Sequence, residues 1–457
     1  MNKKIWILLG VIVVIVGGYF LYANYSGMSM MNGTVSATAT SSKIKIVYAV
    51  QWSESDQLNG FTEPNGTKVL GLNQYLAEYN AAHPDVDVVA ETIPENDYAT
   101  ELPVLSSANE APDIYQVYSI WAPAYVQSGI LAQSPADIVQ DVQTNYISSA
   151  GATIGGQIWG IPTEVDDYAL LYNKNLFKAA GIVDANGNAL APTTWAELVA
   201  DAVKLTTHDA KGNIAQYGMA FLTGNDWQSV DPFLSLLFSN GGQYLSADNS
   251  KALFNSVAGV GALSAEYELF QKGATDINGN FYNFGKGTVG MVIAPPWVKA
   301  TFEQNFGNTF ASTVGVAPLP YLKKSATLQY SWFMGVMAKS AHQEQAWDFL
   351  RWFTETVQPS GTTPLGDLLA ENIGAIPDRK VDFNAHQDVL GDFFTSVFVA
   401  QMKNSIAEPN IIQAQSIKDD VLMKSIEAVW GGQQTPQQAL SSAAMKTNAL
   451  LATSTHL

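Results

Sequence analysis

Apolar residues recur along the chain with the two spacings that distinguish strands from helices. Ile44, Ile46, Tyr48 and Val50 alternate with other residues, which predicts a strand with one buried face. From Leu72 the apolar positions follow the spacing i, i+3, i+4, i+7, which predicts an amphipathic helix that stops before the proline at position 84. A strand is expected again at residues 86–89. Strands and helices therefore alternate, and we expect an α/β fold with mostly parallel sheets.

Short polar signals predict where several helices and turns begin. Thr194 and Glu197 have the spacing of a capping box, and so do Ser340 and Gln343, which precede an apolar stripe at residues 346, 349, 350 and 353. Three segments, at 184–188, 209–213 and 276–280, share the pattern Asp-x-x-Gly-Asn. They resemble calcium loops but lack the closing Glu, so we interpret them as turns.

Size and charge restrict the class of protein. A chain of 457 residues exceeds what one hydrophobic core usually organises, so two domains or lobes are expected. The formal net charge is −18, with 23 Lys plus Arg against 41 Asp plus Glu, and this charge disfavours binding to nucleic acid. Cysteine is absent, which excludes disulfides, thiolate metal sites and a lipid-modified cysteine.

The N-terminus carries a membrane-targeting pattern. Lys3 and Lys4 precede an apolar run at residues 5–21, close to the length that a membrane-spanning helix needs. We interpret residues 1–25 as an anchor on the outer face of the cell membrane and residues 26–42 as a spacer rich in Ser, Thr and Met. A cleaved signal peptide is the alternative, although no good cleavage site follows the run.

A series of motifs gives the chain a family resemblance. The segment YALLYNKNLFKAAGI at 168–182 reads as a strand, a break at Asn173 and a helix, and APTTWAEL follows at 191–198. Shorter blocks follow the same order as in that family: APDI at 111–114, GIP at 160–162, KGTVGM at 286–291, PW at 296–297, VGVAPLP at 314–320 and AWDFL at 346–350. Together they resemble the family 1 extracellular solute-binding proteins of ABC transporters, the group of the maltose-binding protein.

The resemblance implies a two-lobe fold of the periplasmic-binding-protein type II, with solute bound in the cleft between discontinuous lobes. About three hinge crossings are implied, near 164–167, 314–320 and 373–377. One lobe would hold residues 43–164 and 321–374, and the other 167–314 and 378–457. The implied partners are a sugar ligand, the permease subunits of an ABC importer and the membrane, for a monomeric protein.

Catalytic motifs are absent, whereas aromatic residues are plentiful. The sequence has no Walker A loop, no Gly-x-Ser-x-Gly elbow and no His-Glu-x-x-His, and its five histidines lack metal-ligand spacing. We therefore expect no catalytic residue, metal or cofactor. It has 11 Trp and 19 Tyr. Flat aromatic rings with Asp, Glu, Asn or Gln suit a sugar, which has an apolar face and a rim of hydroxyl groups.

Candidate ligand-binding residues come from the motifs and from strand ends. The resemblance places Trp297 where the family stacks a tryptophan on sugar, Asp166 where it has a carboxylate, and Tyr118, Ser119, Trp121, Asp226 and Trp227 at the cleft. Ile120 and Trp121 replace an acidic and a basic residue of maltose binders, which argues against maltose itself. Trp52 and Glu54 follow the first strand and are expected at its carboxyl end. The remaining candidates are Trp332, Gln415 and Asp419.

Alternatives remain open for these residues and for the function. Trp297 and Trp332 could be core residues, the segment with Trp52 could be an exposed loop, and Asp166 and Asp167 could be solvated hinge residues. A membrane-tethered glycoside hydrolase that uses a carboxylate pair is the alternative function. The same receptor fold with a peptide, polyamine or phosphorylated polyol as ligand is a third.

Overall fold

The computed structural model describes residues 43–62, 66–224 and 227–453. By its contacts the chain divides after Ser42, and the anchor and spacer expected before this point lie outside the described residues. Within the described ranges, no helix is long and apolar enough to cross a membrane.

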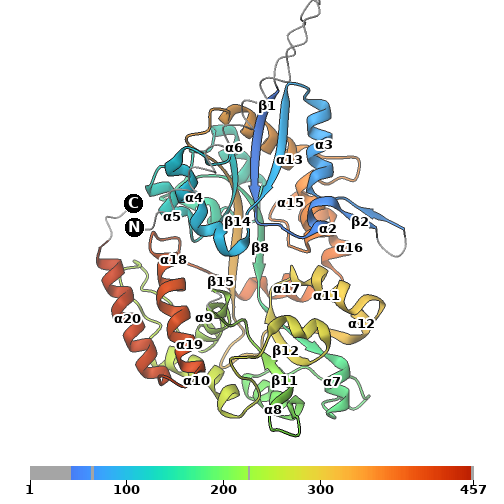
Figure 1. Cartoon of the computed structure of the whole chain (residues 1–457), viewed down its shortest axis with the longest axis vertical. Helices are drawn as coiled ribbons and strands as arrows, with labels where there is room; N and C mark the ends of the chain where they lie inside the picture. Colours follow the sequence, from blue (N-terminus) through green and yellow to red (C-terminus); the bar gives the residue numbers. More distant parts are fainter. Residues whose placement is uncertain (1–42, 63–65, 225–226, 454–457) are drawn as a thin grey trace, which may run out of the picture. The chain divides into compact units, whose positions relative to one another are not determined.

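Two mixed sheets organise the unit that begins at Lys43 (Figure 1). The first has the order β15-β14-β5-β1-β4, and β8 also pairs with β14. Its strands are β1 (Ile44–Val50), β4 (Val86–Thr92), β5 (Ile114–Tyr118), β8 (Ile161–Asp167), β14 (Thr327–Val336) and β15 (Ser405–Ala407). The second has the order β10-β11-β12-β9-β13. Its strands are β9 (Ala169–Asn173), β10 (Thr207–His208), β11 (Ile214–Ala220), β12 (Val289–Ala294) and β13 (Val314–Ala317).

The expectation of mostly parallel strands is wrong. β1 is parallel to β4 and β5, and β11 is parallel to β12, but β14 runs antiparallel to β5 and β8, and β9 runs antiparallel to β12 and β13. β10 is antiparallel to β11 as the first strand of a hairpin, whereas β9 and β14 are the strands that the chain enters directly from the other sheet. A strand entered in this way has no helical crossover to return it to the parallel direction.

The chain passes between the sheets where β8 becomes β9, at Asp167 and Tyr168, and again between β13 and β14. A further passage follows Gly374, where Pro377 pairs with Glu164 before the chain enters helices that pack on the second sheet. The chain then returns once more, because β15 pairs with β14 of the first sheet. This return lies within residues 378–457, which were expected in the second lobe.

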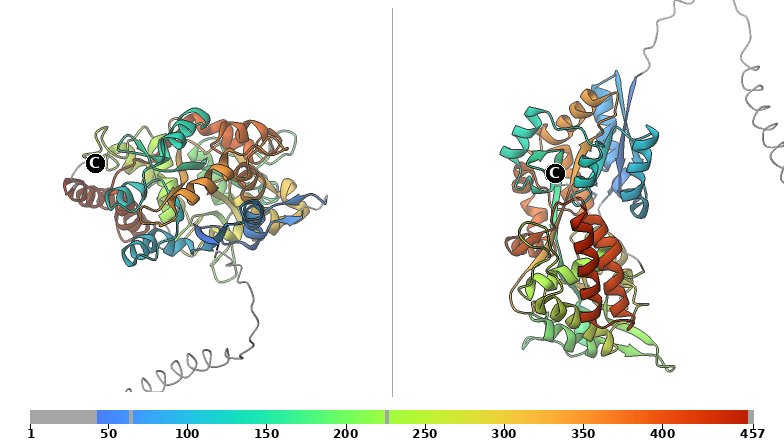
Figure 2. Two further views of the ribbon diagram at one scale, coloured as in Figure 1. Left: turned by 90° about the horizontal axis from the view of Figure 1, so that it is seen from above. Right: turned by 90° about the vertical axis from the view of Figure 1, so that its left-hand side faces the viewer.

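Helices cover both sheets (Figure 2). In chain order they are α2 (Ser55–Asn59), α3 (Leu72–Ala82), α4 (Glu95–Ala108), α5 (Ala122–Gln127), α6 (Ala136–Asn145), α7 (Lys174–Ala179), α8 (Trp195–Leu205), α9 (Val230–Ser239), α10 (Val257–Gln271), α11 (Val298–Phe306), α12 (Phe310–Thr313), α13 (Gln343–Glu355), α14 (Pro364–Asp367), α15 (Lys380–Ala385), α16 (Gln387–Leu390), α17 (Thr395–Gln401), α18 (Ala414–Ser416), α19 (Lys424–Trp430) and α20 (Pro436–Ala452). Two π-helices, η5 (Leu368–Ile373) and η7 (Ile417–Met423), interrupt this series.

Shorter elements complete the unit. Two small hairpins pair β2 (Phe61–Thr62) with β3 (Lys68–Val69) and β6 (Thr153–Ile154) with β7 (Gln157–Ile158). The 3-10 helices are η1 (Ala150–Ala152), η2 (Trp227–Ser229), η3 (Phe281–Lys286), η4 (Gly307–Thr309) and η6 (Met402–Asn404). The long red helix α20 packs with α10 and α19 beside the second sheet (Figure 2).

Several local predictions are confirmed. α3 ends at Ala82 and buries Leu72, Tyr75, Leu76 and Tyr79, the four residues of the predicted stripe. The Asn173 side chain caps α7 by accepting hydrogen bonds from two backbone N–H groups of its first turn. The Asp-x-x-Gly-Asn segments are turns in which the Asp side chain accepts backbone N–H groups two to four residues ahead.

The capping box expected at Ser340 and Gln343 is not formed. α13 begins at Gln343 after His342, whose side chain makes no cap. The Ser340 hydroxyl instead donates to Asp113 at 2.6 Å and accepts the N–H of His342 at 2.9 Å. The local pattern predicted that Ser340 would cap the helix, but its side chain bonds instead to Asp113, which is distant in the sequence.

Candidate functional site

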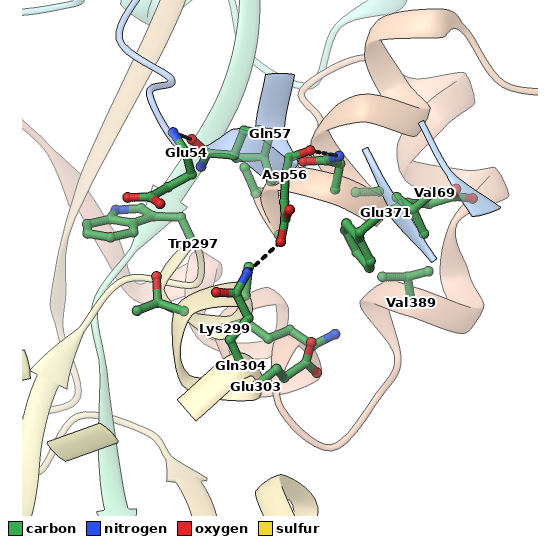
Figure 3. A pocket seen from close by; sticks show the side chains of 18 of the residues that line it. Glu54, Asp56, Gln57, Val69, Trp297, Lys299, Glu303, Gln304, Glu371 and Val389 are labelled. Carbon is green, nitrogen blue, oxygen red and sulfur yellow. Dashed lines mark hydrogen bonds between the residues drawn. The ribbon is translucent and has the colours of Figure 1, made fainter. Parts of the chain in front are cut away.

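A cavity of about 1120 Å³ is lined by segments from both sheets. The first sheet contributes the loop and helix after β1 and the ends of β8 and β14, while α11 and α12 follow β12 of the second sheet. A third side of the cavity is formed by η5 and by residues 388–393. Residues more than 300 positions apart in the sequence thus line the same cavity, and Figure 3 shows the side chains of 18 of the lining residues.

Aromatic rings form much of the apolar lining. Trp297 is the N-cap residue of α11 and is only partly buried, although it packs against the core. Trp52 and Trp332 also line the cavity, with 4% of their surface exposed. Tyr168 and Tyr330 add two phenol rings whose centroids lie 5.7 Å apart. Flat apolar surfaces are therefore available beside polar groups in one cavity.

Two buried carboxylates project from β8. Side chains alternate along a strand, so Glu164 and Asp166 share one face, and both line the cavity. The Tyr330 hydroxyl donates to Asp166 at 3.3 Å, and the backbone N–H of Ile376 donates to its other oxygen at 3.2 Å. Asp166 therefore connects three of the segments that meet at the passages between the sheets.

Burial shifts the acidity of both groups. Burial, reinforced by the charge of Asp166, raises the pKa of Glu164 to about 8. Burial also raises the pKa of Asp166 to about 7, although the hydrogen bonds from Ile376 and Tyr330 oppose the rise. Near neutral pH these carboxyl groups are partly protonated, so they can donate as well as accept hydrogen bonds.

The charges around the cavity are predominantly negative. Among the described lining residues, eight are acidic and one, Lys299, is basic. Lys299 forms an ion pair with Asp392 at 2.7 Å, so its charge is already compensated. The acidic residues are Glu54, Asp56, Glu164, Asp166, Glu303, Glu371, Asp388 and Asp392. An anionic solute would be repelled here, whereas hydroxyl groups would find many acceptors.

One hydrogen bond joins opposite walls of the cavity. The Gln304 amide of α11 donates to the Asp56 carboxylate of α2 at 2.8 Å, as Figure 3 shows. The backbone carbonyl of Asp56 accepts a hydrogen bond from Asn372 in η5 at 2.9 Å. The three walls are thus in contact through the side chain and the backbone carbonyl of Asp56 in α2.

Five of the residues expected at the site line the cavity: Trp52, Glu54, Asp166, Trp297 and Trp332. Tyr118, Ser119 and Trp121 do not line it. Tyr118 stacks on Trp332 with a centroid distance of 5.1 Å, and Trp121 meets Trp332 edge-on at 5.3 Å. Tyr118 and Trp121 are therefore packed around a tryptophan of the lining, where they support its position.

A buried network of charges holds Tyr118 in place. Its hydroxyl donates to Glu408, and Lys418 lies within hydrogen-bond distance of the same hydroxyl at 3.2 Å. Lys418 also forms ion pairs with Asp231 at 2.6 Å and Glu408 at 2.8 Å. All three charged side chains are buried, so the network fixes the position of the phenol ring.

The other expected residues lie elsewhere or outside the described part. Gln415 and Asp419 lie in α18 and η7, away from the lining, and a hydrogen bond from Gln415 opposes the rise that burial causes in the pKa of Asp419. Asp167 faces away from the cavity and accepts a hydrogen bond from Gln401 at 3.2 Å. Asp226 and the side chain of Trp227 lie outside the described residues.

Some lining residues were not among the expected ones. Glu164 and Tyr330 are each two residues from an expected residue on the same strand, so the alternation of strand faces could have identified them. The lining residues of η5, from Ala370 to Ile373, offered no such signal. They precede the third passage between the sheets, and only the assembled fold brings them to the cavity.

Comparison with known proteins gives one matching family and several relatives. Residues 63–358 match the family described as bacterial extracellular solute-binding protein. The maltooligosaccharide ABC transporter solute-binding lipoprotein of Streptococcus pneumoniae is 25% identical over 384 residues, which cover 79% of this chain and 82% of the relative. The sn-glycerol-3-phosphate-binding periplasmic protein UgpB of Salmonella paratyphi A is 24% identical over 421 residues, which cover 84% and 90%.

Solved structures share the fold. The GacH receptor of Streptomyces glaucescens, determined without ligand and with acarbose, superposes with a TM-score of 0.74 at 20% identity and covers 90% of this chain and all of the receptor. At this identity the similarity establishes a two-lobe binding-protein fold. Because the relatives above bind different solutes, the solute of this chain must be inferred from its own cavity.

Proposed function

This chain belongs to the bacterial extracellular solute-binding protein family, and we propose that its cavity captures a neutral mono- or oligosaccharide for delivery to a membrane permease. The observation that carries the proposal is the composition of the lining: three tryptophans and three tyrosines beside buried carboxylates, with a lysine that is already paired. A sugar ring needs an apolar plate for its C–H face and acceptors for its hydroxyl groups, and this cavity offers both.

Electrostatics favours a neutral solute over a phosphorylated one. A phosphate group is normally held by Arg, Lys or several backbone N–H groups. Among the described lining residues the only cation is Lys299, and the carboxylate of Asp392 lies 2.7 Å from its ammonium group. A phosphorylated polyol would therefore meet repulsion from the surrounding acids without a compensating charge.

Size and position support capture by closure. A cavity of about 1120 Å³ exceeds the upper end of the usual range for small-molecule sites, roughly 300–1,000 Å³, which leaves room for more than one sugar ring. Its walls come from both sheets, so a solute that contacts both walls stabilises a closed arrangement by its differential affinity. We propose that the permease recognises that arrangement, and that the role needs no catalysis.

A ligand screen tests the proposal. The fragment 43–457 would be heated with neutral oligosaccharides, with phosphorylated sugars and with short peptides, and the melting temperature would be measured for each. We expect a neutral saccharide to raise the melting temperature progressively as its concentration exceeds the dissociation constant, and to be recovered without new reducing ends. Stabilisation by a phosphorylated sugar alone would contradict the proposal, and release of reducing ends would support the hydrolase instead.

A further inference from the structure

We propose that Asp367, Glu371 and His386 form a binding site for one divalent transition-metal ion, with Zn²⁺ as its best occupant. The site lies beside the solute cavity, because Glu371 also lines the cavity (Figure 3). The proposal concerns a different ligand from the solute, so it does not depend on which solute the cavity takes. It rests on the ligand atoms, on the orientation of the histidine and on the charge of the cluster.

The three side chains bring one ligand atom each into a small volume. These atoms all lie within 4.8 Å of one another. Nε2 of His386 is 3.0 Å from an oxygen of Asp367 and 3.9 Å from an oxygen of Glu371. Bonds of about 2.0–2.2 Å to one zinc ion place its ligand atoms roughly 3.0–3.6 Å apart, so only a small shift is needed. The Glu371 side chain is 43% exposed, which allows it to make that shift.

The histidine is oriented as a metal ligand. Its Nδ1 lies 2.9 Å from the backbone carbonyl of Asp382, and a carbonyl only accepts, so Nδ1 must carry a proton. This hydrogen bond leaves Nε2 to face the two carboxylates. A backbone carbonyl on the far ring nitrogen is the usual arrangement around ligating histidines, because it fixes the ring and its tautomer.

The segment that presents the carbonyl is itself held firmly. Both oxygens of the Asp382 side chain accept hydrogen bonds from Thr363, at 2.7 Å from its N–H and 2.8 Å from its hydroxyl. Thr363 is also the N-cap residue of α14, the helix that ends at Asp367. The histidine and the first carboxylate are therefore fixed by one connected set of contacts.

The charge of the cluster fits a divalent ion. Without a metal, a protonated His386 balances only one of the two carboxylates. A divalent ion displaces the Nε2 proton, which leaves for solvent, and two carboxylates with a neutral imidazole then give a site of zero net charge. One nitrogen and two carboxylate ligands suit Zn²⁺ and leave a fourth position for water. A simple ion pair between His386 and Asp367 is the competing explanation, and it predicts no metal affinity.

Titration calorimetry distinguishes the two explanations. The purified full-length chain, stripped with a chelator and dialysed, would be titrated with ZnCl₂. We expect one equivalent to bind, and binding to weaken at least about tenfold in Asp367→Asn and His386→Gln. His208→Gln changes an exposed histidine on β10 and should bind as the wild type does. Absence of binding to the wild type, or equal affinity in all variants, would overturn the proposal.

Two further measurements keep the proposal testable if Asp367→Asn or His386→Gln fails to fold. Glu371→Gln alters the most exposed ligand, so it should keep the wild-type circular dichroism spectrum and melting temperature while its affinity for zinc falls. Co²⁺ added to the wild-type chain should give visible absorption bands of a low-coordinate site, and one equivalent of ZnCl₂ should remove them. A Co²⁺ spectrum identical to that of the free aqueous ion would count against the site.

Discussion

Trp297 is the residue on which the proposed contact with a solute depends most. It is partly exposed to the cavity, whereas Trp52 and Trp332 are 4% exposed. Replacing it by Ala removes a rigid plate, so the affinity for the saccharide should fall by about 2 kcal/mol or more, which is at least tenfold. Phe keeps a flat apolar face and should restore much of the loss, whereas Leu should not. Titration calorimetry would measure the dissociation constants.

Trp121 provides the matched control. It is buried, lies outside the cavity lining and packs edge-on against Trp332 and Tyr118. Trp121→Leu should therefore lower the melting temperature and raise the dissociation constant much less than Trp297→Ala does. If Trp297→Ala lowers the melting temperature but raises the dissociation constant no more than Trp121→Leu does, Trp297 is a core residue and the proposed contact is wrong.

Glu164 should make the stability of the protein depend on pH. Burial raises its pKa to about 8, and burial also raises the pKa of Asp166 and of Asp378 to about 7. The folded state then binds more protons than the unfolded chain between about pH 4 and pH 8, so the free energy of unfolding falls as the pH rises through this range. The contribution is full below the unfolded pKa and is lost above the folded one.

Urea unfolding at pH 5 and at pH 8 would measure this dependence. The wild type should be more stable at pH 5, and Glu164→Gln should reduce the difference between the two values, since Gln carries no charge at either pH. Glu78→Gln changes an exposed glutamate of α3 and should leave the difference as it is. A wild type that is more stable at pH 8 would contradict the explanation.

At the scale of single elements, the start of α8 offers a clean test. The Thr194 hydroxyl accepts the N–H of Glu197 at 3.3 Å, and the Glu197 carboxylate accepts the N–H of Thr194 at 3.0 Å. Thr194→Ala leaves one donor of the first turn without its partner, so the free energy of unfolding should fall by about 1 kcal/mol. Affinity for the solute should not change, because α8 does not line the cavity. If urea unfolding gave the same free energy of unfolding for Thr194→Ala as for the wild type, the prediction that this cap stabilises the protein would be wrong.

Elements with strong local patterns were predictable, and those that depend on tertiary partners were not. The stripe from Leu72 to Tyr79 and the break at Asn173 are local, and both were located from the sequence. Ser340 shows the limit, since its hydroxyl bonds to Asp113, 227 residues earlier. The predicted strand directions were wrong for the same reason. The direction of β14 depends on passages of the chain between the two sheets, and no short sequence pattern reveals these passages.

The same distinction applies to the candidate site. Trp52 and Glu54 follow a predictable strand, and Trp297 follows a recognisable motif; all three line the cavity. Tyr118 and Trp121 do not line the cavity but pack against Trp332, which does. The motif predicted their positions along the chain but not the directions of their side chains. The wall formed by η5 carries no motif, and only the assembled fold brings it to the cavity.

At the scale of the whole folded unit, we expect the solute to close the cavity. The walls belong to two sheets joined by passages at Asp167, between β13 and β14, and after Gly374. Small-angle scattering of the fragment 43–457 should show a smaller radius of gyration with a saturating saccharide than without it. An unchanged radius with saturating solute would argue against closure.

The most direct test of the central claim is a calorimetric titration of this fragment with a neutral oligosaccharide and with its phosphorylated counterpart. The acidic lining and the paired Lys299 predict that the neutral sugar binds with a stoichiometry of one. They also predict that the added phosphate weakens binding by at least about tenfold, since its charge meets carboxylates without a free cation. Equal or tighter binding of the phosphorylated sugar would contradict the account.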